Sequence, residues 1–168
     1  MCGVAFGISL NSFESLTLKE GIYSRGKDNF GSFNTSEGHE LYHSRLSILD
    51  LSANGNQPML SKNKKWVISF NGEIYNYIEL KKKYNIKTKT STDTEVLIEL
   101  ISKQGINAIK ELKGPFALIL IDTLTNKKYF CRDAFGEKPL YVYKLLDKLA
   151  ISSTLKSLTW KNSCLLYT

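Results

Sequence analysis

Short apolar segments constrain the fold of this chain more than any other feature of its sequence. The longest uninterrupted apolar run, residues 116–121, holds six residues, whereas a helix needs ~20 apolar residues to cross a bilayer. Residues 3–10 are apolar enough to form a strand that is buried on both faces. We therefore expect no membrane span, and 168 residues suffice for one domain with a real core.

Strands dominate the second half of the chain. Residues 115–122 and 127–133 flank a short polar turn and predict a hairpin, and residues 139–153 predict another. In the first half, residues 40–51 alternate like a strand. A further strand is expected to end at Asn71-Gly72, because this pair suits a tight turn.

Two segments carry helix signals. The earlier one follows the first strand and has Asn11 or Ser12 as its N-cap. In the later one, Thr92 as N-cap and Glu95 at the third helical position predict a capping box. Its apolar face and closing glycine are Val96, Leu97, Leu100, Ile101 and Gly105. The chain is therefore expected to be one mixed domain of helices and strands.

The net charge of +7 raises the question of a nucleic-acid partner. The excess is mostly lysine, in separate runs at residues 62–65, 81–83 and 127–128. No aromatic residues are interleaved with these runs to form a base-stacking platform. A solvated basic surface is the favoured interpretation, and no nucleic-acid partner is expected.

The cysteines and histidines indicate no disulfide framework and no metal site. Cys2, Cys131 and Cys164 are odd in number and lack metal-ligand spacing. Only two histidines are present, and His43 is interpreted as a structural hydrogen-bonding residue. The first residues lack the basic and apolar regions of a secretory signal, so we expect a cytoplasmic protein.

Seven segments occur in an order that matches a known family. They are MCGVAFG, RGKDNFG, HSRLSILDLS with NQPM, FNGEIYNY, STDTEV, LKGPFAL and CRDAFGEKPLY. With them the chain resembles the glutamine-hydrolysing domain of class II glutamine amidotransferases, and the asparagine synthetase branch most closely. The resemblance implies an α+β fold, a four-layer αββα sandwich of two mostly antiparallel sheets, as in N-terminal nucleophile hydrolases.

The resemblance covers residues 1–158 as one amidotransferase domain. Residues 159–168 are then a C-terminal tail, and one interpretation makes them the start of a linker to an absent synthetase domain. Three explanations stay open: a fragment of a longer protein, a free-standing subunit that feeds ammonia to a separate synthetase, or a degraded remnant.

Cys2 has two interpretations. Most free cysteines are buried and only pack, which would make it an ordinary core residue. By the resemblance it is the nucleophile: removal of Met1 would leave a thiol and a free α-amine on one residue. The α-amine has a pKa of ~7.7–8.0 and is a competent base near neutral pH, so no histidine partner is needed.

The resemblance assigns the oxyanion donors to the side-chain amide of Asn71 and the backbone N–H of Gly72. An asparagine supplies a neutral donor, and a glycine lets the backbone approach the substrate closely. A simple turn at Asn71-Gly72 is the alternative, and the two roles are compatible.

The resemblance also assigns a binding site for free glutamine. Arg45 would pair with the α-carboxylate, a role suited to a guanidinium group, and Glu73 and Asp93 would receive the α-ammonium. Leu46 and Ile48 complete the substrate-binding set. Asp93 also sits in the first turn of a predicted helix, where it would complement the helix dipole.

Together these expectations describe hydrolysis of L-glutamine to glutamate and ammonia through a cysteine thioester. No cofactor or metal is expected in this domain; ATP and magnesium would act only on the missing synthetase domain or subunit, which would receive the ammonia. The alternative is a catalytically inactive amidotransferase-fold remnant that serves as a binding or regulatory module.

Overall fold

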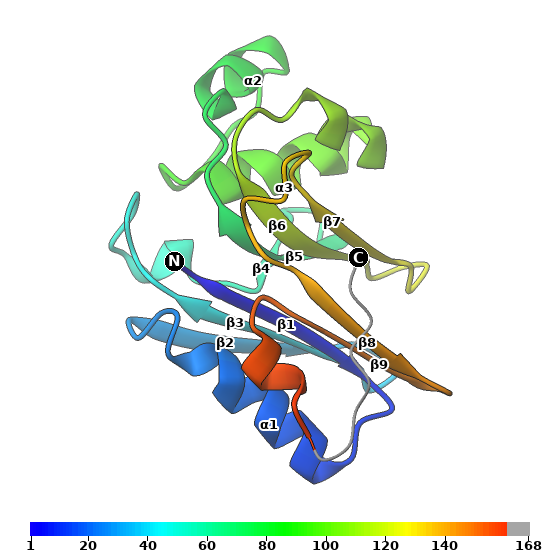
Figure 1. Cartoon of the computed structure of the whole chain (residues 1–168). Coiled ribbons are helices and arrows are strands. Elements are labelled where there is room, and N and C mark those ends of the chain that lie inside the picture. The colour runs from blue at the N-terminus through cyan, green and yellow to red at the C-terminus, as the bar shows by residue number, and fades with distance from the viewer. Residues whose placement is uncertain (161–168) are drawn as a thin grey trace.

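Two antiparallel sheets lie face to face, with helices covering both outer faces (Figure 1). The computed structural model describes residues 1–160. Helix α1 (Ser12–Tyr23) packs on the outer face of one sheet, together with η3 (Leu155–Leu158). Helix α3 (Asp93–Gln104) covers the other sheet, and helix α2 (Tyr77–Lys83) packs beside α3. This is the α+β four-layer sandwich that the resemblance implied.

All strand pairs are antiparallel. The five-stranded sheet has the order β2-β3-β1-β9-β8 and the four-stranded sheet the order β4-β5-β6-β7. The strands are β1 (Gly3–Ile8), β2 (Asn29–Asn34), β3 (Glu40–Arg45), β4 (Met59–Leu60), β5 (Trp66–Gly72), β6 (Phe116–Asp122), β7 (Lys128–Arg132), β8 (Tyr141–Leu145) and β9 (Lys148–Ser152). Short 3-10 helices are η1 (Ala53–Gly55) and η2 (Ile106–Glu111). Both predicted hairpins, β6-β7 and β8-β9, are present.

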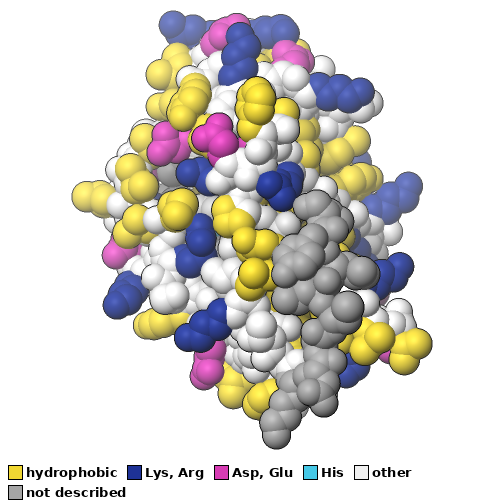
Figure 2. All heavy atoms as spheres, viewed as in Figure 1, with side chains coloured by type: hydrophobic (Ala, Val, Ile, Leu, Met, Phe, Trp, Pro, Cys, Tyr) yellow, Lys and Arg dark blue, Asp and Glu magenta, His cyan; other side chains and the backbone are white. Residues whose placement is uncertain are grey.

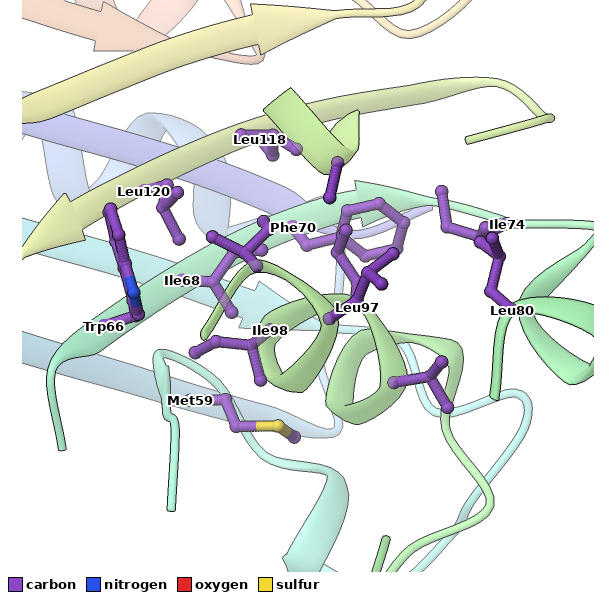
Figure 3. Packing of buried hydrophobic residues seen from close by; sticks show 14 of the residues in the cluster. Met59, Trp66, Ile68, Phe70, Ile74, Leu80, Leu97, Ile98, Leu118 and Leu120 are labelled. Carbon is purple, nitrogen blue, oxygen red and sulfur yellow. The ribbon is translucent and has the colours of Figure 1, made fainter. Parts of the chain in front are cut away.

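Two apolar clusters of the described residues hold the sheets to each other and to α2 and α3, and a third packs α1 and η3 on the five-stranded sheet. Between the sheets, Val4 and Phe6 of β1 face Val67 of β5 and Ile119 of β6. Between β5, β6 and the helices α2 and α3, the cluster of Figure 3 includes Trp66, Ile68, Phe70, Leu97, Ile98, Leu118 and Leu120. Because β1, β5 and β6 are buried on both faces, their apolar runs lack the alternation of half-buried strands.

Both helix starts use local side-chain caps, with one difference from the prediction. Asn11 caps α1 with a full capping box, in which Glu14 N–H donates to the Asn11 side chain and Asn11 N–H to Glu14 (2.9 Å each). Thr92 caps α3 by accepting from Glu95 N–H at 3.2 Å. The Glu95 carboxylate instead accepts from Lys89 and Thr90, so the predicted box at Thr92 is only half formed.

One predicted strand end is wrong and another is right: β5 ends at Gly72, as expected. Strand β3 ends at Arg45 rather than continuing to residue 51, because the following loop wraps around the Arg45 guanidinium. Asn71 and Gly72 do not form a turn: they pair with Ala117 and Phe116 of β6. Strands β2 and β4 and helix α2 were not predicted, although β2 and β3 form a hairpin closed by a short turn at residues 35–39.

On the face seen in Figure 2, the Lys and Arg side chains are spread out rather than gathered into one platform. Within the tail predicted from residue 159, Trp160 packs its ring edge-on against Tyr143, with centroids 5.2 Å apart. The rest of that tail, including Cys164, lies outside the described residues. None of the described helices has the length and apolar composition to cross a membrane.

His43 links the two sheets from a fully buried position. Its Nε2 lies 3.1 Å from the carbonyl oxygen of Phe70, which confirms it as a structural hydrogen-bonding residue. Burial lowers the pKa of His43 from 6.5 to about 4, against the effect of the Phe70 carbonyl and with a smaller contribution from Arg45.

The buried His43 should make the protein less stable as the pH falls. Between pH 6.5 and 4 the unfolded chain binds a proton at His43 that the folded chain does not, so stability is full above pH 6.5. The loss on acidification should approach about 3 kcal/mol. Urea unfolding of wild type and His43→Gln across this range should show that the difference between their free energies of unfolding changes by this amount. A difference that does not change with pH would contradict the prediction.

Candidate active site

Cys2 is held at the start of β1, beside the loop that follows β3. Arg25 Nε donates to the Cys2 carbonyl oxygen at 2.8 Å. The Cys2 Sγ lies 3.4 Å from Leu46 N and 3.6 Å from Leu46 O, so it accepts from and donates to the same backbone residue. Met1 is more than half exposed. Both the backbone and the thiol of Cys2 are thus fixed in position.

Burial raises the pKa of the Cys2 thiol. The Leu46 backbone contact, the chain's amino terminus, Arg45 and Arg25 act in the opposite direction but do not offset burial. The thiol is therefore mostly protonated at neutral pH, whereas the thiolate is the reactive form. A nucleophilic Cys2 in this position needs a base beside it.

One pocket brings the predicted residues together from four parts of the chain. It is lined by all of them except Asn71: Cys2, Arg45, Leu46, Ile48, Gly72, Glu73 and Asp93. Leu49, Asp50, Gly55, Gln57, Phe70, Thr92 and Thr94 complete its wall. The start of β1, the loop after β3, the end of β5 and the start of α3 converge there.

The Asn71 side chain points from β5 toward the five-stranded sheet, whose strand β1 begins directly after Cys2. Side chains alternate along a strand, and the neighbours Val67 and Ser69 face that sheet: Ser69 Oγ donates to the Tyr42 carbonyl at 3.0 Å. Asn71 is buried, and its Nδ2 has no hydrogen-bond acceptor among the described residues. A buried amide donor without an acceptor costs free energy, which is consistent with a donor kept for a substrate.

Gly72 places a backbone amide on the open edge of β5. Glu73 N–H donates to Pro115 O at 3.0 Å on the β6 side, and Phe70 N–H donates to Gln57 on the opposite side. Because amides alternate along an antiparallel strand, Gly72 N–H points to the same edge as Phe70 N–H. Glycine is required because a Cβ here would lie 2.3 Å from the Pro115 carbonyl oxygen.

Arg45 organises the loop after β3. Its Nη1 donates to Ser52 O and to Asn56 Oδ1, both at 2.8 Å, and its Nη2 donates to Asp50 O. Gly55 packs directly on the guanidinium, since a Cβ would lie 2.3 Å from Nη2. All three acceptors are neutral, and no carboxylate of residues 1–160 forms an ion pair with Arg45. Its charge therefore suits an anionic group in the pocket.

Asp93 and Glu73 place two carboxylates on the opposite wall. Asp93 Oδ2 accepts from Ile74 N–H at 2.9 Å. Burial raises the pKa of Asp93, its hydrogen bonds to Ile74 and Thr94 lower it, and the nearby Glu73 carboxylate raises it further. A cation between the two carboxylates would relieve this repulsion.

Sequence reasoning missed several residues that shape the pocket. Asp50 and Asn56 hold Arg45, and Gln57 and Thr94 link β5 to α3. The sequence signal was present in part, because each lies inside a matched segment, but no local pattern indicates a contact across 37 residues such as Gln57 to Thr94.

No His, Cys, Asp and Glu side chains of the described residues cluster in groups that could hold a metal ion. A wider pocket of about 540 Å³ lies at the other end of β1, lined by residues such as Ser15, Lys19, His39 and Glu40. It contains none of the predicted site residues.

Comparisons with known proteins point in one direction. A family model described as a glutamine amidotransferase domain matches residues 1–165. A putative glutamine-hydrolysing asparagine synthetase 2 from Methanocaldococcus jannaschii is 38% identical, over 94% of this chain and 35% of its own length. Glutamine-hydrolysing asparagine synthetases from Bacillus subtilis (number 2) and Arabidopsis thaliana (number 1) are both 36% identical over 94% of this chain, covering 22% and 28% of their own lengths.

Solved structures show the same fold. The glutamine phosphoribosylpyrophosphate amidotransferase of Bacillus subtilis, complexed with ADP and GMP, superposes with a TM-score of 0.81 at 20% identity, over 98% of this chain and 44% of that one. A structure described as the allosteric regulatory enzyme of purine biosynthesis gives a TM-score of 0.78 at 19% identity, covering 99% of this chain and 44% of that one.

This chain spans about a fifth to a third of the length of the three asparagine synthetases named above. From the family match and these identities, the chain belongs to the family of class II glutamine amidotransferase domains.

Proposed function

We propose that this chain hydrolyses L-glutamine to glutamate and ammonia, with Cys2 as the nucleophile. The observation that carries the proposal is that one pocket brings together Cys2, Arg45, which has no ion pair among the described residues, and the Asp93 and Glu73 carboxylates. Arg45 complements an α-carboxylate and the two carboxylates an α-ammonium, so the pocket fits the zwitterionic end of a free amino acid. Leu46 and Ile48 line the same pocket and would contact its aliphatic part.

The reaction requires removal of Met1, which frees the α-amine of Cys2. This amine takes the thiol proton, and the thiolate attacks the carboxamide carbon. Asn71 Nδ2 and Gly72 N–H donate to the resulting oxyanion. The carbon–nitrogen bond breaks, ammonia leaves with the proton returned from the amine, and water hydrolyses the thioester to glutamate.

Ammonia is proposed to pass to a synthetase domain or subunit, since this chain matches only part of each relative. ATP and magnesium would be used there for an amidation of the kind that the names of the relatives state. We propose that this domain itself needs no cofactor and that the reaction takes place in the cytoplasm.

The direct test is an assay of glutamate release from L-glutamine by protein whose N-terminal mass shows that Met1 is absent. Cys2-dependent release is the expected result. Met-free, folded protein that binds glutamine but releases no glutamate, alone or with a co-purified ATP-dependent synthetase, would favour the inactive remnant instead.

The carboxylate pairing of Arg45 is testable with two truncated substrates. 4-Aminobutanamide keeps the ammonium and carboxamide but lacks the α-carboxylate, whereas 4-carbamoylbutanoate lacks the α-ammonium. Wild type should prefer glutamine to 4-aminobutanamide by about 10- to 100-fold in kcat/KM, the worth of a charged hydrogen-bonded pair. Arg45→Gln should reduce that preference specifically and leave the preference over 4-carbamoylbutanoate largely intact. An equal loss for both analogues would assign Arg45 only to loop structure.

A further inference from the structure

Gln57 connects two walls of the pocket from a buried position. Its Oε1 accepts from Phe70 N–H at 2.8 Å, on the open edge of β5. Strand β4 pairs with β5 only at Ile68 and Val67. The Gln57 side chain therefore takes the place of a neighbouring strand at the last position before Asn71.

From Gln57 the hydrogen bonds continue into the first turn of α3. Gln57 Nε2 donates to Thr94 Oγ1 at 3.4 Å, and the Thr94 hydroxyl donates to Asp93 Oδ1 at 3.4 Å. Each group can take its role in this series, because the amide nitrogen of Gln57 only donates, whereas the hydroxyl of Thr94 can accept from Gln57 and donate to Asp93. All three side chains are at most 6% exposed.

The contacts close into a ring. Asp93 Oδ2 accepts from Ile74 N–H, four residues after Phe70, so the chain of bonds leaves the backbone at Phe70 and rejoins it at Ile74. The ring brackets residues 71–73, the segment that carries both proposed oxyanion donors and one ammonium-binding carboxylate. Hydrogen bonds in such a network orient one another.

We propose that Gln57 and Thr94 are positioning residues that fix the Asp93 carboxylate relative to residues 71–73. One glutamine can then place its ammonium at Asp93 and its carboxamide at the oxyanion donors at the same time. This inference rests on the proposed function and deepens it. Neither residue touches the reacting atoms. Their effect passes through Asp93, which loses a donor on Oδ1 when the Thr94 hydroxyl is removed.

The charges around Asp93 set how binding depends on pH. Glu73 faces it from the end of β5, and Cys2, Arg45 and Asp50 line the same pocket, while Glu95 on α3 is turned to the backbone of residues 89–90. The Thr94 contacts lower the pKa of Asp93. Without the hydroxyl, Asp93 becomes protonated at a higher pH than in wild type. As the pH falls, ammonium binding should therefore weaken earlier in the variant than in wild type.

Thr94→Val removes the hydroxyl at nearly constant volume, and Thr94→Ser restores it. In Thr94→Val, kcat/KM for glutamine should fall about three- to tenfold, mostly through KM, as for one weak hydrogen bond to a charge. The rate with 4-carbamoylbutanoate, which has no ammonium, should change little. Thr94→Ser should behave as wild type, and Thr35→Val, which removes a buried hydroxyl remote from the pocket, should leave KM unchanged.

Calorimetric measurement of glutamine binding to Cys2→Ala, between pH 5 and 8, separates this inference from the proposed function. If adding Thr94→Val makes this binding weaken at a higher pH, the positioning role of Thr94 is supported. An unchanged pH profile, or equal losses for glutamine and 4-carbamoylbutanoate in the turnover assay, would overturn it.

If Thr94→Val does not fold, Gln57→Glu tests the same link, because it keeps the acceptor for Phe70 N–H and lacks the donor to Thr94. Wild type without glutaminase activity and Cys2→Ala without glutamine binding would instead count against the proposed function.

Discussion

Replacing Cys2 by alanine is expected to reduce glutamate release from L-glutamine by about 10⁴-fold or more, as removal of a covalent nucleophile does in other hydrolases. The thiol lies in the pocket with Arg45 and Asp93, fixed by Arg25 and Leu46. Alanine keeps the backbone contact of Arg25 to the residue 2 carbonyl, so glutamine binding should persist. Glutamate release is measured by a coupled assay, with binding followed separately by calorimetry.

Cys131→Ala is the matched control. Cys131 lies in β7, in a different pocket from Cys2, and packs at the margin of the core between β5, β6 and α3. It should retain wild-type kcat and KM and lose only some stability. Residual activity of Cys2→Ala near the wild-type level would contradict covalent catalysis by Cys2, whatever the state of Met1.

Replacing Asn71 by leucine should lower kcat by about 10²- to 10³-fold with little change in KM, the range measured for loss of one oxyanion donor. Leucine has a shape close to that of asparagine without the donor. Because Asn71 Nδ2 has no acceptor among the described residues, its removal should cost little stability and is compatible with a gain. Thermal unfolding and steady-state kinetics of the same preparation measure both effects.

The pairing of these two readouts makes the Asn71 test specific. A structural asparagine would lose stability on replacement, with a fall in activity that follows the fraction folded. A ground-state contact to glutamine would instead appear as a rise in KM. Either pattern would contradict the assignment of Asn71 to the oxyanion.

Local signals in the sequence predicted local structure well. Asn11 and Thr92 cap α1 and α3 because capping depends on residues within one helical turn. The hairpins β6-β7 and β8-β9 join neighbouring segments of the chain, and the apolar runs mark the strands that are buried on both faces. The layered fold itself came from the family motifs, since periodicity does not specify how strands are ordered.

Predictions failed where a distant residue overrode the local pattern. The alternation of residues 40–51 continues past Arg45, yet the backbone turns because carbonyl groups of that loop bind the buried guanidinium. At Asn71-Gly72 only the turn is absent: both residues pair with β6, and β5 ends at Gly72 as predicted. The reciprocal bond of the Thr92 cap is lost because Glu95 binds the preceding loop.

By itself, the sequence determined which residues are available for the chemistry and the family to which they belong, because Cys2, Arg45, Asn71–Glu73 and Asp93 occur in matched segments. Only the tertiary structure decided that all of these except Asn71 line one pocket, that Arg45 has neutral hydrogen-bond partners and that Asn71 Nδ2 has no acceptor among the described residues. The physical reason is that burial and hydrogen-bond pairing are properties of contacts between segments far apart in the chain, such as Gln57 with Thr94, and no short stretch of sequence contains both partners.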